Sequence, residues 1–216
     1  MVGGNVTIGG ELKLKKIGAK MAPVTWRMRN AMRWGYMWGI FCFYLARGFS
    51  WLTGIPTVTG RLRLRKRLID GTWIDYGWVG YRVVTNAGVA FMVDDFDPTT
   101  ASATNDITTL KYHGVGTTNT AENVADTALA AECTTALNPD STRATGVSSQ
   151  PSANIYQTVG TLVFDAASTA VVEHGLFSQA ATGGGTLWDR TVFAVVTMLT
   201  GESLQCQYQG TINSGG

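Results

Sequence analysis

Four runs of β-favouring residues follow one another between Tyr156 and Ile212, and they constrain the fold more than any other part of the chain. The runs are rich in Val, Thr, Phe, Leu and Tyr, side chains that pack well on a pleated, half-buried surface. They cover Tyr156–Phe164, Ala170–Phe177, Thr186–Thr200 and Ser203–Ile212. The breaks between them are short and carry turn residues, such as Gly183–Gly185. Since a parallel crossover needs about a dozen residues or more, we predict antiparallel neighbours in a β-meander that forms one wall of a sandwich.

The composition fits a β-rich domain with a substantial core. Hydrophobic residues make up 45% of the 216-residue chain, charged residues only 15%, and 26 residues are glycine, which suits tight turns. This length has room for one ordinary domain and an extension. Apolar side chains of the four runs are predicted to supply most of the C-terminal core. They are Phe164, Leu176, Phe177, Leu187, Val192, Phe193 and Val195.

An alternating basic segment precedes these runs. Between Arg61 and Asp70, leucine stands at positions 62, 64 and 68, so a strand would place the leucines on one face and arginines on the other. Asp70 and Gly71 form a two-residue hairpin signal, and the returning strand is Trp73–Tyr81. The arginine row is a candidate partner-binding surface for phosphate or for a carboxylate-rich protein face, and the alternative is a solvated sheet face. The row comprises Arg61, Arg63, Arg65 and Arg67.

The segment Trp34–Ala46 is apolar on all sides, so its periodicity does not decide between helix and strand. A membrane-spanning helix needs about 20 apolar residues, which this run reaches only by extending across Arg47. Aromatic side chains are common hot spots of protein interfaces, which favours an anchor in a partner protein. A core element of the same chain and a membrane segment are the alternatives. The predicted anchoring side chains are Trp34, Trp38, Phe41 and Phe43.

Charge is distributed unevenly along the chain, although its formal net value is only +2. Residues 1–82 contain 14 of the 17 Lys and Arg residues but 3 of the 15 Asp and Glu residues. This basic part indicates an acidic partner, which can be nucleic acid or an anionic protein or membrane surface. The alternative is attraction between the two halves, or between copies in an oligomer. Sequence-specific nucleic-acid recognition is not expected, because the interleaved stacking aromatics of known RNA-binding modules are absent.

Three further elements are predicted between the hairpin and the four runs. Thr85–Asp95 has a capping residue and apolar bulk typical of a helix. Ile107–His113 alternates like a strand, and residues 114–118 follow as a turn. Residues 120–132 are predicted to form a short helix capped by Asp126.

No catalytic motif is recognisable, including phosphate loops, dinucleotide fingerprints and nucleophile elbows. The cysteines, Cys42, Cys133 and Cys206, are odd in number and far apart, so reduced and mostly buried thiols are expected. We predict from this that the protein is not an enzyme and has no metal, no cofactor and no catalytic residue.

The two histidines, His113 and His174, have no partner at ligand or triad spacing. Glu173 and His174 are adjacent, but adjacent residues of a strand point to opposite faces. A buried polar role that ties strands together is predicted instead for His174, Arg190 and Glu132.

A series of short motifs occurs in order from Arg82 to the end of the chain. They are Arg82-Val-Val-Thr-Asn-Ala-Gly-Val, Asp95-Phe, Tyr112-His-Gly-Val-Gly-Thr-Thr, Thr120-Ala-Glu, Asp126-Thr-Ala-Leu, Tyr156-Gln-Thr-Val-Gly-Thr, Glu173-His-Gly-Leu-Phe, Gly185-Thr-Leu-Trp-Asp-Arg-Thr-Val-Phe and Ile212-Asn-Ser-Gly-Gly. Their order and spacing resemble a β-domain of many structural proteins of tailed bacteriophages and phage-like metagenomic sequences. Residues 20–60 lie outside this resemblance.

The resemblance implies a non-enzymatic virion protein, made in a bacterial cytoplasm and attached to other virion proteins as a homo-oligomer. We expect a head decoration, cement or minor capsid protein. The alternatives are a tail or neck component, such as an adaptor or fibre, and a membrane- or nucleic-acid-associated binding protein built on the basic half. A membrane partner is not expected.

The expected architecture is mainly β. Residues 61–216 are predicted to form an antiparallel β-sandwich or jelly-roll-like domain with one or two short helices. Residues 1–60 are predicted to form an extended, basic and aromatic N-terminal arm that anchors the domain.

Overall fold

The computed structural model of the chain describes residues 57–95 and 107–213, together with separate positions between Met37 and Thr53. The elements are β1 Thr57–Arg67, β2 Trp73–Val84, α2 Asn86–Asp95, the 3-10 helix η1 Ile107–Thr109, β3 Tyr112–Gly116, β4 Ala144–Thr145, β5 Val147–Ser152, β6 Ile155–Val163, β7 Thr169–Phe177, β8 Leu187–Met198 and β9 Ser203–Asn213. All pairings between these strands are antiparallel. The predicted fold class, a mainly β antiparallel sandwich with short helices, is confirmed.

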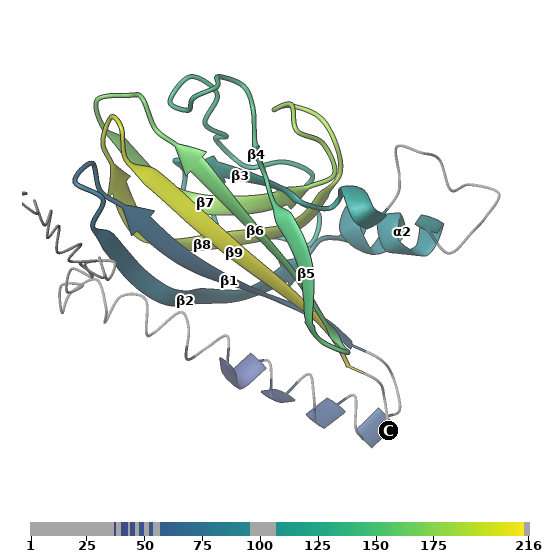
Figure 1. Ribbon diagram of the computed structural model, residues 1–216. Helices are drawn as coiled ribbons and strands as arrows, with labels where there is room; N and C mark the ends of the chain where they lie inside the picture. Colours follow the sequence, from purple (N-terminus) through teal and green to yellow (C-terminus); the bar gives the residue numbers. More distant parts are fainter. Residues whose placement is uncertain are drawn as a thin grey trace, which may run out of the picture.

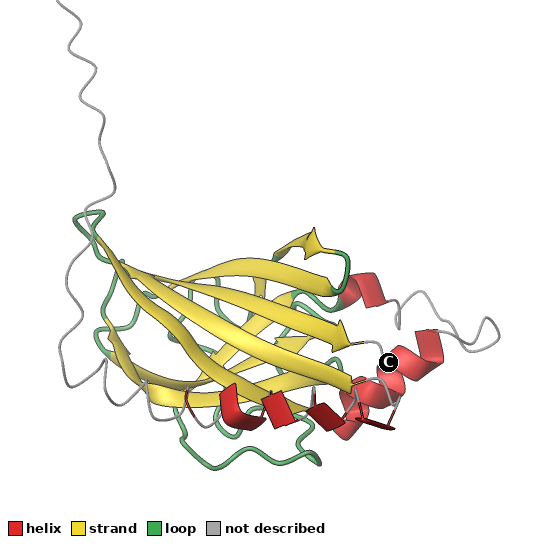
Figure 2. Cartoon of the chain, turned by 90° about the horizontal axis from the view of Figure 1, so that it is seen from below, coloured by secondary structure: helices red, strands yellow, loops and turns green. Residues whose placement is uncertain are grey.

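The strands form two layers that β2 joins. One layer contains β5, β6, β9, β1 and β2, and the other contains β4, β3, β7 and β8. At its end, β2 pairs Val83 with Arg190 and Val84 with Asp189 of β8, so the hydrogen bonding continues from one layer into the other. Figure 1 shows the two layers and places α2 at one end of the strands. Figure 2 shows the same arrangement from below, with the strands lying along the length of the domain.

The chain also passes between the layers at Gly146. This residue alone separates β4, which pairs with β3, from β5, which pairs with β6. A Cβ atom at this position would lie 2.0 Å from Thr158 Oγ1 and 2.8 Å from His113 Nε2, so glycine is required here. The two layers are therefore connected by backbone on both edges, through β2 on one and through β4 and β5 on the other.

The predicted four-stranded meander is wrong, although all four predicted strands exist. Of these strands, β7 pairs with β8, whereas β6 and β9 pair with each other in the opposite layer. The short connections after Val163 and Met198 carry the chain between layers instead of turning it back within one sheet. Backbone hydrogen bonds join these two connections: Phe164 N–H donates to Glu202 O at 2.9 Å, and Gly201 N–H donates to Phe164 O at 2.7 Å.

The core lies between the layers and contains most of the predicted apolar residues. Those confirmed as buried are Phe164, Leu176, Phe177, Leu187 and Phe193. Val195 is 49% exposed and Val192 is only half-buried, so these two predictions are wrong. The register between β7 and β8 shifts opposite this segment, and the inward-facing positions therefore move on to Val196 and Met198.

The predicted hairpin and the helix that follows it are confirmed. β1 and β2 pair across a turn at Asp70 and Gly71, where Gly71 has a φ of +80°. Helix α2 begins after Thr85, whose Oγ1 accepts a hydrogen bond from Gly88 N–H at 3.0 Å. This contact makes Thr85 the N-cap, since it satisfies a backbone donor of the first turn.

Two other local predictions are wrong. Residues 107–109 form η1, and β3 begins at Tyr112 and continues through Gly116, where the pattern predicts a turn. Residues 120–132 contain no helix. Groups of this loop bind Arg190 instead: Thr120 O and Ala121 O accept hydrogen bonds from its guanidinium, and Asp126 pairs with it.

Most of the predicted N-terminal arm, residues 1–60, lies outside the described residues. The described positions between Met37 and Thr53 are helical, and β1 begins at Thr57, inside the segment predicted as arm. Among the residues that the structure describes, no helix has the length and apolar character needed to cross a membrane.

Candidate functional site

The arginine row lies along β1, and its side chains face away from the core. The predicted alternation is confirmed, because Leu62 and Leu64 are fully buried while the arginines are partly exposed or, at position 67, exposed. Lys66 differs from its neighbours because it points inward and is buried. Its Nζ lies 2.6 Å from a carboxylate oxygen of Glu202 and 2.6 Å from Thr197 O.

Neighbouring side chains hold the arginine row against the sheet. Arg61 donates a hydrogen bond from Nε to Gln209 Oε1 at 2.7 Å, and its guanidinium carbon lies 4.0 Å from the ring centre of Trp78. The guanidinium of Arg65 lies 5.0 Å from the ring centre of Trp73. Such cation–π contacts order the side chains and leave their outer edges accessible.

Asp75 of β2 is an acidic partner within this surface. It forms an ion pair with Arg63, and one of its oxygens lies 3.9 Å from Arg65 Nε. Burial raises the pKa of Asp75, but hydrogen bonds from Arg63 and Gly77 N–H and the charges of Arg63 and Arg65 outweigh this effect and lower it. Asp75 is therefore ionised at neutral pH, and it offsets only part of the positive charge of the row.

Phe41 belongs to an exposed apolar surface on the N-terminal helical segment. The described large apolar side chains there are each more than half exposed. They are Met37, Phe41, Tyr44, Leu45, Phe49 and Leu52, here called the apolar stripe. At 3.6 residues per turn, these positions fall within an arc of about 140° on one side of a helix. The other predicted anchoring residues, Trp34, Trp38 and Phe43, lie outside the described residues.

Arg190 is the centre of a buried charge network between β7, β8 and the loop at 120–132. Its Nε and Nη2 donate to Glu173 Oε2 at 2.9 and 2.8 Å, and its Nη1 donates to Asp126 Oδ2 at 2.8 Å. Glu173, which is fully buried, also accepts hydrogen bonds from the N–H groups of Ala130 and Ala131. The predicted structural role of Arg190 is therefore confirmed, and the network fixes the loop on the strands.

A second buried arginine holds two other loops. Arg143 Nε lies 2.6 Å from Glu132 Oε1, and its Nη1 donates to Gln179 O and Gly184 O at 3.0 and 2.7 Å. Its guanidinium carbon lies 3.4 Å from the ring centre of Phe177. The predicted structural role of Glu132 is confirmed, because this carboxylate neutralises a guanidinium that is only 2% exposed.

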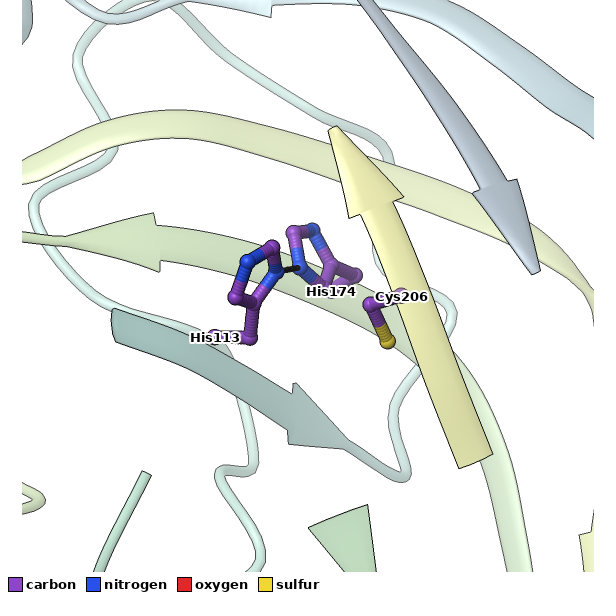
Figure 3. A group of neighbouring side chains, drawn as sticks. All are labelled: His113, His174 and Cys206. Carbon is purple, nitrogen blue, oxygen red and sulfur yellow. Dashed lines mark hydrogen bonds between the residues drawn. The ribbon is translucent and has the colours of Figure 1, made fainter. Parts of the chain in front are cut away.

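The two histidines, which have no partner at motif spacing in the sequence, meet in the core. His113 on β3 and His174 on β7 occupy neighbouring strands, and their Nδ1 and Nε2 atoms lie 2.9 Å apart. Cys206 approaches from β9 in the opposite layer, and Figure 3 shows it beside the two facing rings. One ligand atom from each of the three residues can be chosen so that all lie within 4.8 Å of one another. The buried polar role predicted for His174 is therefore confirmed, because its ring ties β7 to His113 on β3.

Full burial determines the protonation of these side chains. Burial lowers the pKa of His113 to about 3, and burial together with the neighbouring His113 holds the pKa of His174 well below its ordinary value. Both imidazoles are therefore neutral at pH 7. Burial also raises the pKa of the Cys206 thiol. Nδ1 of His174 has no hydrogen-bond partner among the described residues.

An apolar cavity of about 440 Å³ lies at one end of the sandwich. Its walls include Met92 of α2, Trp188 of β8, Tyr156 of β6 and Ile212 of β9. Residues 96–106, which connect α2 to η1, lie outside the described part of the chain. We therefore assign no ligand to this cavity.

The glycine that follows each histidine, at positions 114 and 175, gives no signal for the cluster. Neighbouring residues of a strand point to opposite faces, and a Cβ atom at either glycine would meet Phe177 and no histidine ring. The glycines that pack against His113 are Gly146 and Gly160, where a Cβ atom would lie 2.8 Å from Nε2 and 2.5 Å from Cδ2 of this ring. Both are distant from His113 in the sequence, and His113 and His174 are themselves 61 residues apart.

The described features differ in what they can contact. The apolar stripe and the arginine row are exposed and can meet another molecule, whereas the cluster of His113, His174 and Cys206 is closed from solvent. No protein-family model, no curated protein and no solved structure matches this chain.

Proposed function

We propose that this chain is a structural component of a bacteriophage particle, namely a head decoration, cement or minor capsid protein attached through its N-terminal segment. The observation that carries the proposal is the apolar stripe, whose side chains are each more than half exposed. Exposed large apolar side chains gathered in one segment are typical of a protein interface. Repetition of one such contact over many copies on a particle converts modest affinity into high avidity.

The construction of the domain supports a structural role. Ion pairs join strands to loops, as in Lys66 with Glu202 and Arg190 with Asp126. Such pairs specify loop geometry more than they add stability. A domain fixed in this way presents a constant outer surface while its N-terminal segment makes the attachment.

Two alternatives are separated by different measurements. A tail or neck component would use the same apolar stripe, but it would be present in few copies per particle, so quantitative mass spectrometry of purified virions distinguishes it. A nucleic-acid-binding role is favoured by the arginine row, and it requires steep salt dependence of binding to duplex DNA, because each neutralised phosphate releases counterions.

Changing the apolar stripe is expected to abolish attachment without unfolding the domain. In the variant Phe41→Asp/Leu45→Asp, charges replace two exposed apolar side chains of the stripe. We expect loss of incorporation into virions, measured by mass spectrometry of purified particles, and an unchanged melting temperature. Deletion of residues 22–55 is expected to give the same result, because β1 begins at Thr57.

The matched control is Val147→Asp, because Val147 is 75% exposed and lies on β5, outside the stripe. This variant should be incorporated normally. Normal incorporation of the Phe41→Asp/Leu45→Asp variant would contradict the proposed attachment. Insolubility of the 22–55 deletion would instead place the segment in the core of the domain.

The arginine row is expected to strengthen attachment to an acidic virion surface. In Arg61→Gln/Arg65→Gln, two guanidinium groups that face outward are removed, whereas exposed charges contribute only about 0–1 kcal/mol to stability. We expect the double variant to associate more weakly with particles at low salt than the wild type does. Its association should also change less with salt concentration, because fewer charges remain for salt to screen. The control is Lys111→Gln, which removes a positive charge outside the row, from the residue just before β3. Wild-type association of the double variant at all salt concentrations would identify the row as a solvated face.

A further inference from the structure

We propose that His113, His174 and Cys206 form a three-coordinate binding site for a monovalent copper ion in the core of the sandwich. The three side chains come from β3, β7 and β9, so such an ion would bridge the two layers. This proposal does not depend on the proposed virion role.

The three side chains offer ligand atoms that suit a soft metal ion. Two imidazole nitrogens and one thiolate are ligands that soft and borderline metals prefer, and Cu⁺ and Zn²⁺ lead that group. The carboxylates nearest in sequence are already engaged, since Glu173 binds Arg190.

The geometry is close to that of a trigonal site. Metal bonds of about 2.0 Å to nitrogen and 2.3 Å to sulfur require ligand atoms about 3.5–3.7 Å apart. The facing nitrogens of His113 and His174 are 2.9 Å apart, and the ligand atoms of the full set lie within 4.8 Å of one another. The required separation falls between these values, so small side-chain rotations complete the site.

Charge balance distinguishes copper from zinc. The site is fully buried, and burying an uncompensated charge is costly. Cu⁺ with one thiolate and two neutral imidazoles carries no net charge, whereas Zn²⁺ with the same ligands leaves one positive charge in the core. When the ion binds, one Cu⁺ enters and the thiol proton of Cys206 leaves, with no change of oxidation state.

Thr158 lies next to the proposed site and can orient the ring of His113. Thr158 Oγ1 lies 3.4 Å from Nε2 of His113, on the side of the ring away from His174. Metal-bound histidines commonly donate their other N–H to such a group.

The test uses the full chain with Cys42→Ser and Cys133→Ala, so that Cys206 is the only thiol. Because the site is closed from solvent, the protein is refolded anaerobically with Cu⁺ and then challenged with a chromophoric Cu⁺ chelator. We expect one copper per chain, and X-ray absorption should show two nitrogen ligands and one sulfur ligand. Further replacement of Cys206 by alanine is expected to weaken binding by about 100-fold or more, beyond the usual effect of losing an outer-shell partner.

The control is the chain that carries Cys133→Ala alone, since Cys133 is a buried cysteine outside the cluster. It should bind copper as the wild type does. Equal binding by the Cys206→Ala variant, binding of Zn²⁺ in preference to Cu⁺, or no retained copper would each overturn the proposal. If Cys206→Ala does not fold, His113→Gln provides the second test, with the same outcomes.

Discussion

Replacing Arg190 with methionine is expected to lower the free energy of unfolding by about 3–5 kcal/mol, which is the usual cost of removing one partner from a buried ion pair. Arg190 is 2% exposed, and its partner Glu173 is fully buried. Without the guanidinium, Glu173 would keep only the N–H groups of Ala130 and Ala131 as partners. The carbonyls and Asp126 of the 120–132 loop would also lose their common donor, so this loop should loosen first.

Chemical denaturation followed by tryptophan fluorescence measures this loss. The matched control is Arg63→Met, because the ion pair of Arg63 with Asp75 lies on the outer face, where such pairs contribute about 0–1 kcal/mol. The double variant Arg190→Met/Glu173→Gln should recover part of the stability, since no unpaired charge remains. A loss below about 1 kcal/mol for Arg190→Met alone would show that the network does not hold the loop.

Acidification of the metal-free protein is also expected to produce a large loss of stability. The folded state holds the pKa of His113 at about 3 and that of His174 well below its ordinary value, whereas the unfolded chain titrates near pH 6.5. Below pH 6.5 the unfolded state therefore binds protons that the folded state excludes. The stability that these neutral imidazoles contribute is complete above pH 6.5 and is lost as the pH falls toward the folded-state pKa values.

Each imidazole accounts for at most about 1.4 kcal/mol per pH unit, so the pair should cost roughly 2–3 kcal/mol between pH 6 and pH 5. Carboxyl groups add little in this window, because their ordinary pKa values lie near 4. Denaturation at several pH values after treatment with a chelator measures the slope. The variant His113→Gln/His174→Gln should show a much flatter slope. A wild-type stability that does not change between pH 6 and pH 5 would contradict neutral burial of the two rings.

Local patterns determined several elements of this protein. The alternation of leucine and arginine in β1, with Asp70 and Gly71 at the turn, specified both the hairpin and which face is buried. Thr85 specified the start of α2. These features depend on side-chain periodicity and on hydrogen bonds between residues close in sequence, and so they can be predicted without knowledge of the rest of the chain.

Only the tertiary structure decided which strands pair and which distant side chains meet. A short connection after β6 or β8 is equally compatible with a hairpin and with a crossing to the other layer, and long-range pairing of β6 with β9 selected the crossing. A long-range contact also explains why the 120–132 loop is not helical. Arg190 donates hydrogen bonds to carbonyl oxygens of this loop and to Asp126, and it is a better partner for these groups than a helix would be.

The histidine cluster depends most on the tertiary structure. His113 and His174 become neighbours because β3 pairs with β7, and Cys206 joins them because β9 lies in the facing layer. Sequence periodicity determines whether a side chain points inward, but it contains no information about which inward-facing side chains share one position in the core. That choice follows from strand order, which is fixed by the hydrogen bonding and packing of the whole domain.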